Sequence, residues 1–143
     1  MSDKFKGIIS VVVLMAILWI VYYPYHYIED YYFLDDEEQL LLPFYAIIFL
    51  VSCLQHYICG KKLWFSDERI LNYVVSFGIF LGIDAIMFIL FLSAGPSNED
   101  PYEPFSFPRY TFQILYCIII GVHYLWSTLV MLIGTLVIEK IKK

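Results

Sequence analysis

The sequence predicts an all-α membrane protein with four transmembrane helices, and three observations lead to this prediction. First, 61 % of the 143 residues are hydrophobic and 16 % are charged, whereas soluble domains carry about 25 % charged residues. Second, uncharged apolar runs continue for about 20 residues, enough to cross a hydrocarbon layer ~30 Å thick. Third, the basic residues gather before the first run, between the second and third runs, and after the fourth, as in multi-pass membrane proteins.

The first span is expected at 5–23. Pro24 follows it and predicts the end of the helix, because proline lacks a backbone N–H and has a fixed φ. Lysines before an apolar run also occur in signal peptides, but the bulky Tyr22 and Tyr23 do not suit a cleavage site. We therefore expect this segment to stay in the membrane as a span.

The second and fourth spans are expected at 40–59 and 112–138. Pro43 falls in the first turn of the second span, where a helix tolerates proline. Gly60 and the lysines after it are typical of a helix end. The fourth span is long enough to tilt or to project beyond the lipid.

The third span is expected at 70–93. Ser66 is the predicted N-cap, and Asp67 and Glu68 then fall in the first turn, where the helix dipole favours negative charge. The Gly95-Pro96 pair follows the span and predicts its end.

Lysine and arginine in short loops stay on the cytoplasmic side during insertion, and this rule orients the four spans. The inner loop 60–69 and both termini are predicted to be cytoplasmic, with the outer loops at 24–39 and 94–111. The whole chain, 1–143, is expected to form a single polytopic domain, and a bacterial inner membrane is the preferred location. Eight of the nine basic residues support this orientation: Lys4, Lys6, Lys61, Lys62, Arg69, Lys140, Lys142 and Lys143.

The first outer loop mixes tyrosines with acidic residues and supports two interpretations. Either the rings form an aromatic belt at headgroup depth, or the acids attract a cationic partner. The second outer loop holds four prolines, which predict a stiff, extended segment. The predicted outer acidic surface consists of Glu29, Asp30, Asp35, Asp36, Glu37 and Glu38.

Two stripes of small residues predict that the third and fourth spans pack together. Helices in lipid associate through close backbone approach, which small residues permit. We expect this packing either within one chain or between two chains. The stripes are Gly78, Gly82 and Ala85 on the third span, and Gly121, Thr128 and Thr135 on the fourth.

Asp84 is the most informative single residue, because an acid deep in a span is costly and suggests function. It lies about 14 Å from the outer end of its span, and His123 lies about 16 Å from that of the next. An Asp84–His123 contact is therefore feasible, and Tyr116 and Ser127 share a helix face with His123 as a polar track. The alternative is a protonated or hydrogen-bonded Asp84 that only specifies helix pairing.

Asp84 points about 120° away from the Gly78/Gly82 stripe on a helical wheel. One neighbouring helix therefore cannot easily satisfy both features.

Cofactor and metal sites are not expected. His56 and Cys59 have metal-ligand spacing, but two ligands without a second pair make a poor site. The three histidines lie at different depths, so no pair suits a haem. Hydrolase, zinc-protease and nucleotide-binding signatures are absent from the sequence. We therefore expect no enzyme activity.

Three function classes remain for such a chain. The preferred one is a noncatalytic accessory protein that binds another membrane protein laterally, including protection against a membrane-inserting toxin. The alternative is a small proton- or ion-coupled transporter that uses Asp84 in an oligomeric bundle. A membrane enzyme or redox carrier is disfavoured. The expected partners are the lipid bilayer and either another membrane protein or a second copy, but not nucleic acid, because the nine cations are scattered and outnumbered by fourteen acids.

Overall fold

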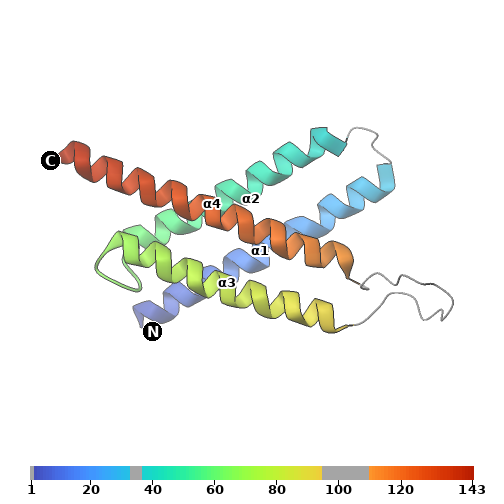
Figure 1. Ribbon diagram of the computed structural model, residues 1–143, viewed down its shortest axis with the longest axis horizontal. Coiled ribbons are helices and arrows are strands. Elements are labelled where there is room, and N and C mark those ends of the chain that lie inside the picture. Colours follow the sequence, from blue (N-terminus) through green and yellow to red (C-terminus); the bar gives the residue numbers. More distant parts are fainter. Residues whose placement is uncertain (1, 33–36, 95–109) are drawn as a thin grey trace.

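The computed structural model describes residues 2–32, 37–94 and 110–143, without the side chains of 25–32 and 37–42. These residues form four helices, each long and apolar enough to cross a membrane: α1 (Asp3–Tyr32), α2 (Glu37–Lys62), α3 (Arg69–Ser93) and α4 (Thr111–Lys142). The predicted all-α architecture is confirmed for the described residues, and the four helices suggest a multi-pass membrane protein. Both chain ends and the turn between α2 and α3 lie at one end of the bundle, which we call the terminal end (Figure 1).

Helix α1 does not end at Pro24, so this part of the prediction is wrong. It continues through the proline to Tyr32. A proline removes one backbone hydrogen bond and favours a kink, but membrane helices accommodate it when local adjustments satisfy the freed backbone groups. The span predicted at 5–23 is therefore only the first part of a longer helix.

Helix α2 begins at Glu37, before the predicted position, and continues past Gly60 to Lys62. Gly60 is buried, and a Cβ atom added there would lie 2.7 Å from the Tyr73 ring. Its small size therefore serves close packing against α3, and it does not stop the helix as predicted. Leu63 follows the helix end, and its φ of 53° is left-handed while its N–H donates to the Cys59 carbonyl at 3.1 Å.

The start of α3 also differs from the prediction. Glu68, and not Ser66, is the N-cap, and no side-chain hydrogen bond caps the helix. The buried Asn72 organises the turn instead: its Nδ2 donates to the carbonyls of Ser66 and Glu68 at 2.7 Å each. Its Oδ1 accepts from the Phe65 N–H at 2.8 Å. Asn72 lies in the first helical turn of α3 and bonds to the residues on both sides of Asp67. Asp67 therefore belongs to the connecting turn before α3 and not to the helix.

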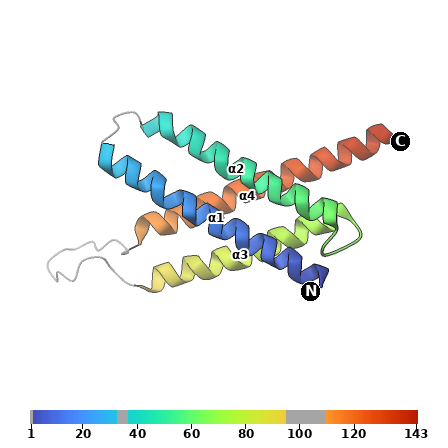
Figure 2. The same cartoon turned by 180° about the vertical axis from the view of Figure 1, so that it is seen from behind.

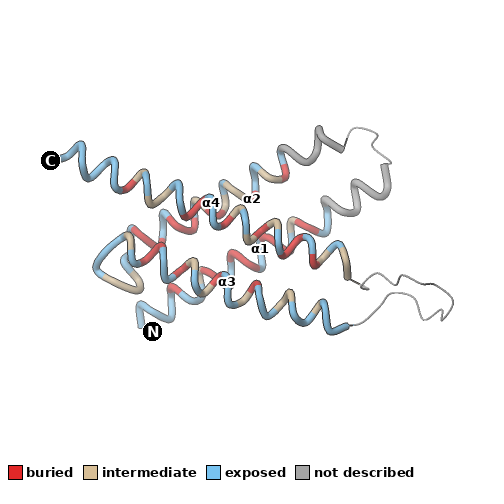
Figure 3. The backbone as a smooth tube through the Cα atoms, in the orientation of Figure 1, coloured by how far each residue is buried: buried red, intermediate tan, exposed pale blue. Residues whose placement is uncertain are grey.

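Helix α4 packs against α2 and α3, and α1 packs against α2 and α3 (Figures 1 and 2). Buried residues follow the inner faces of the bundle, whereas the last turns of α4 are exposed (Figure 3). The half away from the terminal end has an aromatic core, in which Tyr116 packs against Trp19 and Tyr22. Its hydroxyl donates to the Leu18 carbonyl. The other half has a polar core.

Candidate functional site

The polar core centres on Gln55, which bonds to all three other helices. Its Nε2 donates to Ser10 Oγ of α1 at 3.2 Å and to Ser76 Oγ of α3 at 3.0 Å. Its Oε1 accepts from the Tyr124 hydroxyl of α4 at 2.7 Å, and this hydroxyl lies 2.6 Å from Ser76 Oγ. In lipid a buried amide needs such partners, because water cannot replace them. The Gln55 network (Ser10, Gln55, Ser76, Tyr124) therefore joins the four helices.

His56 extends the polar core toward α4. Its Nε2 lies 2.8 Å from Thr128 Oγ1, and the Thr128 hydroxyl itself donates to the Tyr124 carbonyl at 2.8 Å. Because that hydroxyl proton is already used, His56 Nε2 is the donor to Thr128. His56 Nδ1 then carries the lone pair, and it is buried without a hydrogen-bond partner in the described structure.

The predicted stripe on α4 faces inward and contacts two helices. A Cβ atom added at Gly121 would lie 3.0 Å from Asp84 Oδ2 of α3. Thr128 bonds to His56 of α2, as above, and Thr135 Oγ1 lies 3.2 Å from the Tyr73 hydroxyl of α3. The stripe thus supplies close backbone approach at one position and hydrogen bonds at the other two.

The predicted stripe on α3 has the opposite orientation. Gly78, Gly82 and Ala85 are exposed, and an added Cβ at either glycine would meet nothing within 4 Å. The prediction that this stripe packs on the fourth span within one chain is therefore wrong. The reason is that polar and aromatic residues four apart already occupy the inner face of α3, namely Asn72, Ser76, Phe80 and Asp84. Packing of the stripe between chains stays a prediction.

Asp84 is enclosed between α3 and α4. Only 7 % of the residue is exposed, and its Oδ1 has no hydrogen-bond partner among the residues that the structure describes. The Cys117 thiol of α4 lies beside the carboxyl, and Gly121 gives the carboxyl room. The position matches the wheel argument, because the carboxyl faces α4 while Gly78 and Gly82 face outward.

The structure does not bring Asp84 and His123 together. His123 Nδ1 lies 2.8 Å from the Ile119 carbonyl of its own helix, and its ring stacks on Tyr45 of α2 with centroids 4.8 Å apart. The two residues share a depth but not a direction, because His123 is turned by about 200° from Gly121, which faces Asp84.

The proposed polar track beside Asp84 does not form either. Ser127 donates to the Tyr124 carbonyl at 2.8 Å, and Tyr116 bonds to α1. Both side chains therefore serve backbone carbonyls at separate places in the bundle.

Sequence reasoning missed most of the Gln55 network, although a signal exists. Ser10, Gln55 and Ser76 each lie seven residues from the terminal end of their helix, counted from Asp3, Lys62 and Arg69. At 1.5 Å per residue this places the three side chains at one depth, about 10 Å from these ends. Tyr124 gives no such signal, because α4 extends beyond the other helices at that end (Figure 3).

The described part of the chain holds no cluster of three or more His, Cys, Asp or Glu side chains that could bind a metal ion. The predicted outer acidic surface falls outside the described side chains. Glu29, Asp30, Glu37 and Glu38 lie in the far ends of α1 and α2, and Asp35 and Asp36 lie outside the described residues.

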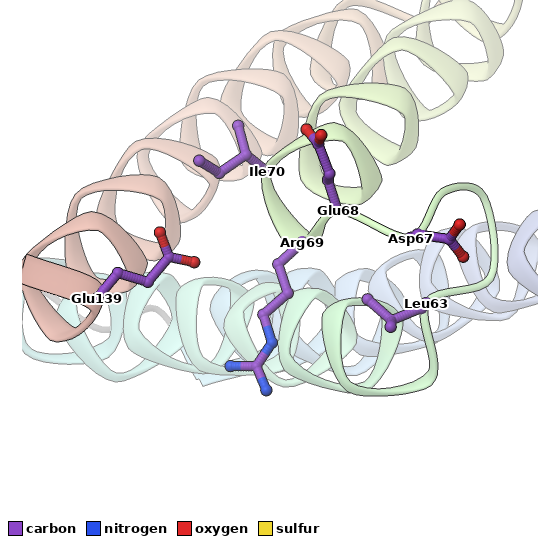
Figure 4. A pocket seen from close by; sticks show the side chains of 6 residues that line it. All are labelled: Leu63, Asp67, Glu68, Arg69, Ile70 and Glu139. Atoms are coloured by element: carbon purple, nitrogen blue, oxygen red, sulfur yellow. The ribbon is translucent and has the colours of Figure 1, made fainter. Parts of the chain in front are cut away.

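A hollow of about 400 Å³ opens at the terminal end, between the α2–α3 turn and α4 (Figure 4). Asp67, Glu68 and Glu139 line it together with Arg69. The three carboxyl groups point in different directions and do not converge on one position (Figure 4). The three residues are exposed to solvent, so this hollow is a charged surface feature.

Comparison with known proteins finds no match to a family model, to a curated protein or to a solved structure.

Proposed function

We propose that this chain is a noncatalytic accessory protein that binds another membrane protein through the exposed stripe of α3, Gly78, Gly82 and Ala85. The observation that carries the proposal is the open space at both glycines. Association in lipid depends on close backbone approach, and this stripe offers it without any role in the chain's own packing. Protection of a host against a membrane-inserting toxin is one form of this function.

The inner face of α3 supports the same proposal. Ser76 and Asn72 are fully buried and bonded within the chain. The bundle is thus held together by one face of α3 and leaves the opposite face for a partner. Under the proposed orientation, with cytoplasmic termini in a bacterial inner membrane, the partner is a helix of the same membrane.

The test compares two variants with matched chemistry. Gly78→Leu/Gly82→Leu blocks close approach on α3, and Gly134→Leu places the same side chain at an open position of α4. Each tagged chain is purified from native membranes in mild detergent, and co-purifying proteins are identified by mass spectrometry. We expect a stoichiometric membrane partner with the wild type and Gly134→Leu that the α3 variant loses. Equal recovery with both variants, or an unchanged oligomer of this chain alone, contradicts the proposal.

One observation favours a second candidate, a proton- or ion-coupled transporter. Asp84 Oδ1 is buried without a hydrogen-bond partner in the described structure, as expected of a group that binds a proton or cation in turn. Proton flux into liposomes that Asp84→Asn abolishes supports this candidate. Wild-type liposomes that are as tight as empty ones contradict it.

A further inference from the structure

An apolar groove runs along the bundle surface between α1 and α2. Its volume is about 190 Å³. Leu14 is buried at its floor, whereas Val13 and Leu54 are exposed at its rim. Between Ser10 and Ile17 it follows α1 for about 10 Å, at 1.5 Å per residue. This stretch lies within the apolar part of both spans, so the groove faces lipid tails.

A polar hollow of about 350 Å³ adjoins the groove at the terminal end, and Trp64 lines both. Lys4 contributes a positive charge to the hollow, and Asp3 and Asp67 contribute negative charges. Asp3 also contacts Lys6 at 3.5 Å, but both side chains are exposed, and such surface pairs open at little cost. Groove and hollow together thus have one apolar part and one part with both signs of charge.

The hollow is a built feature of the fold. Asn72 bonds the turn that carries Trp64, Phe65 and Asp67, as described above. The Phe65 ring packs directly on Gly7 of α1, where an added Cβ would collide with it. Contacts to both α3 and α1 therefore hold the turn, and they fix Trp64 at the boundary between the groove and the hollow.

We propose that the groove and the hollow together bind one phosphatidylethanolamine molecule. An acyl chain lies along Leu14, the phosphate faces Lys4, and the primary ammonium faces Asp3 and Asp67. Carboxylates accept hydrogen bonds from a primary ammonium, whereas the quaternary ammonium of phosphatidylcholine has none to donate. Phosphatidylglycerol has no cation at all and would place a net negative headgroup beside two acids. This site is separate from the exposed stripe of α3, and either proposal can fail alone.

The test measures lipid binding to the full chain in lipid-free detergent by native mass spectrometry. The three lipids carry identical acyl chains and differ in headgroup. We expect one bound phosphatidylethanolamine per chain, with an affinity about tenfold above that for phosphatidylcholine and phosphatidylglycerol. Asp67→Asn should remove most of the preference over phosphatidylcholine, because it replaces one of the two charged ammonium acceptors with a neutral and weaker one.

A second pair of variants tests the groove. Leu54→Trp fills it and should weaken phosphatidylethanolamine binding about tenfold. Leu90→Trp is the control, since Leu90 is similarly exposed, at 62 % against 57 %, but lies on α3. Equal affinity for the three lipids, or equal binding by both tryptophan variants, would show only general lipid coating and overturns the proposal. Asp67 is exposed in the turn, so its variant keeps the test decisive even if Leu54→Trp does not fold.

Discussion

At the residue scale, individual polar side chains hold this bundle together, because apolar burial does not distinguish a neighbouring helix from lipid. Gln55 is the clearest case, with bonds to α1, α3 and α4. Asp84 is the contrasting case, since one of its oxygens is buried without a hydrogen-bond partner among the described residues. Gln55 thus stabilises the bundle, whereas Asp84 Oδ1 remains an unused hydrogen-bond acceptor in the described structure.

Gln55→Leu should destabilise the bundle by about 1–3 kcal/mol. It keeps the side-chain size but removes the Gln55 hydrogen bonds to Ser10, Ser76 and Tyr124. Each hydrogen bond between membrane helices contributes about 0.6 kcal/mol, up to ~1.7. Unfolding of detergent-solubilised protein measures the loss. Gln113→Leu is the control, because Gln113 is half-buried outside this network. Equal stability of both variants would show that the Gln55 bonds contribute nothing.

Gly60→Ala should destabilise the protein by about 1–3 kcal/mol, the usual cost of overpacking, although alanine is the better helix former. The new methyl group would press on the Tyr73 ring, 2.7 Å away, and displace the hydroxyl that bonds to Thr135. Gly134→Ala meets no neighbour and should leave the melting temperature unchanged or raise it. Thermal melts of the two variants test this explanation, and equal shifts of both melting temperatures would contradict it.

At the element scale, the structure shows how much of the fold could be predicted from patterns. The span at 70–93 agrees with α3, because apolar length and flanking polar residues are reliable signals. The helix ends predicted at Pro24 and Gly60 are wrong. A proline can lie inside a membrane helix, and a glycine can permit close helix packing without ending the helix. The cap of α3 depended on Asn72, whose bonds to the turn are tertiary information that no local pattern contains.

Asn72→Ala should loosen the α2–α3 turn while α3 itself remains helical. The amides of Phe65 and Ser66, at 2.8 and 3.4 Å from Asn72 Oδ1, lose their acceptor and should exchange hydrogen faster. Hydrogen exchange followed by mass spectrometry of the turn peptide checks this. Ser93→Ala at the other end of α3 removes an exposed local bond and should leave the turn unchanged. Unchanged exchange in Asn72→Ala would assign the order of the turn to other contacts.

At the scale of the whole molecule, the sequence predicted four spans and the pairing of the third with the fourth, but not which faces meet. The stripe on α4 points inward and the stripe on α3 outward. Each spacing keeps its residues on nearly one face of a helix, so spacing alone cannot separate an internal contact from an external one. The depth of polar residues is the better signal, since Ser10, Gln55 and Ser76 meet at one level.

The proposed orientation predicts how two introduced cysteines are labelled in intact cells. Ser66→Cys, in the turn at the terminal end, should react with a membrane-impermeant thiol reagent only after lysis. Ser106→Cys, in the predicted second outer loop, should react without lysis. The native Cys59 and Cys117 are buried, and the half-buried Cys53 lies inside the apolar span of α2, so the native thiols should give little background. The reverse pattern would invert the orientation and place the proposed lipid site in the other leaflet.

The most direct test of the central claim is photo-crosslinking in native membranes from a reactive side chain at Ala85, on the exposed stripe of α3. Trp126, 58 % exposed on α4, is the comparison position. We expect a discrete crosslinked membrane protein from Ala85 that is absent from Trp126 and is lost in Gly78→Leu/Gly82→Leu. Crosslinks to lipid alone from both positions would contradict a protein-binding function for this face.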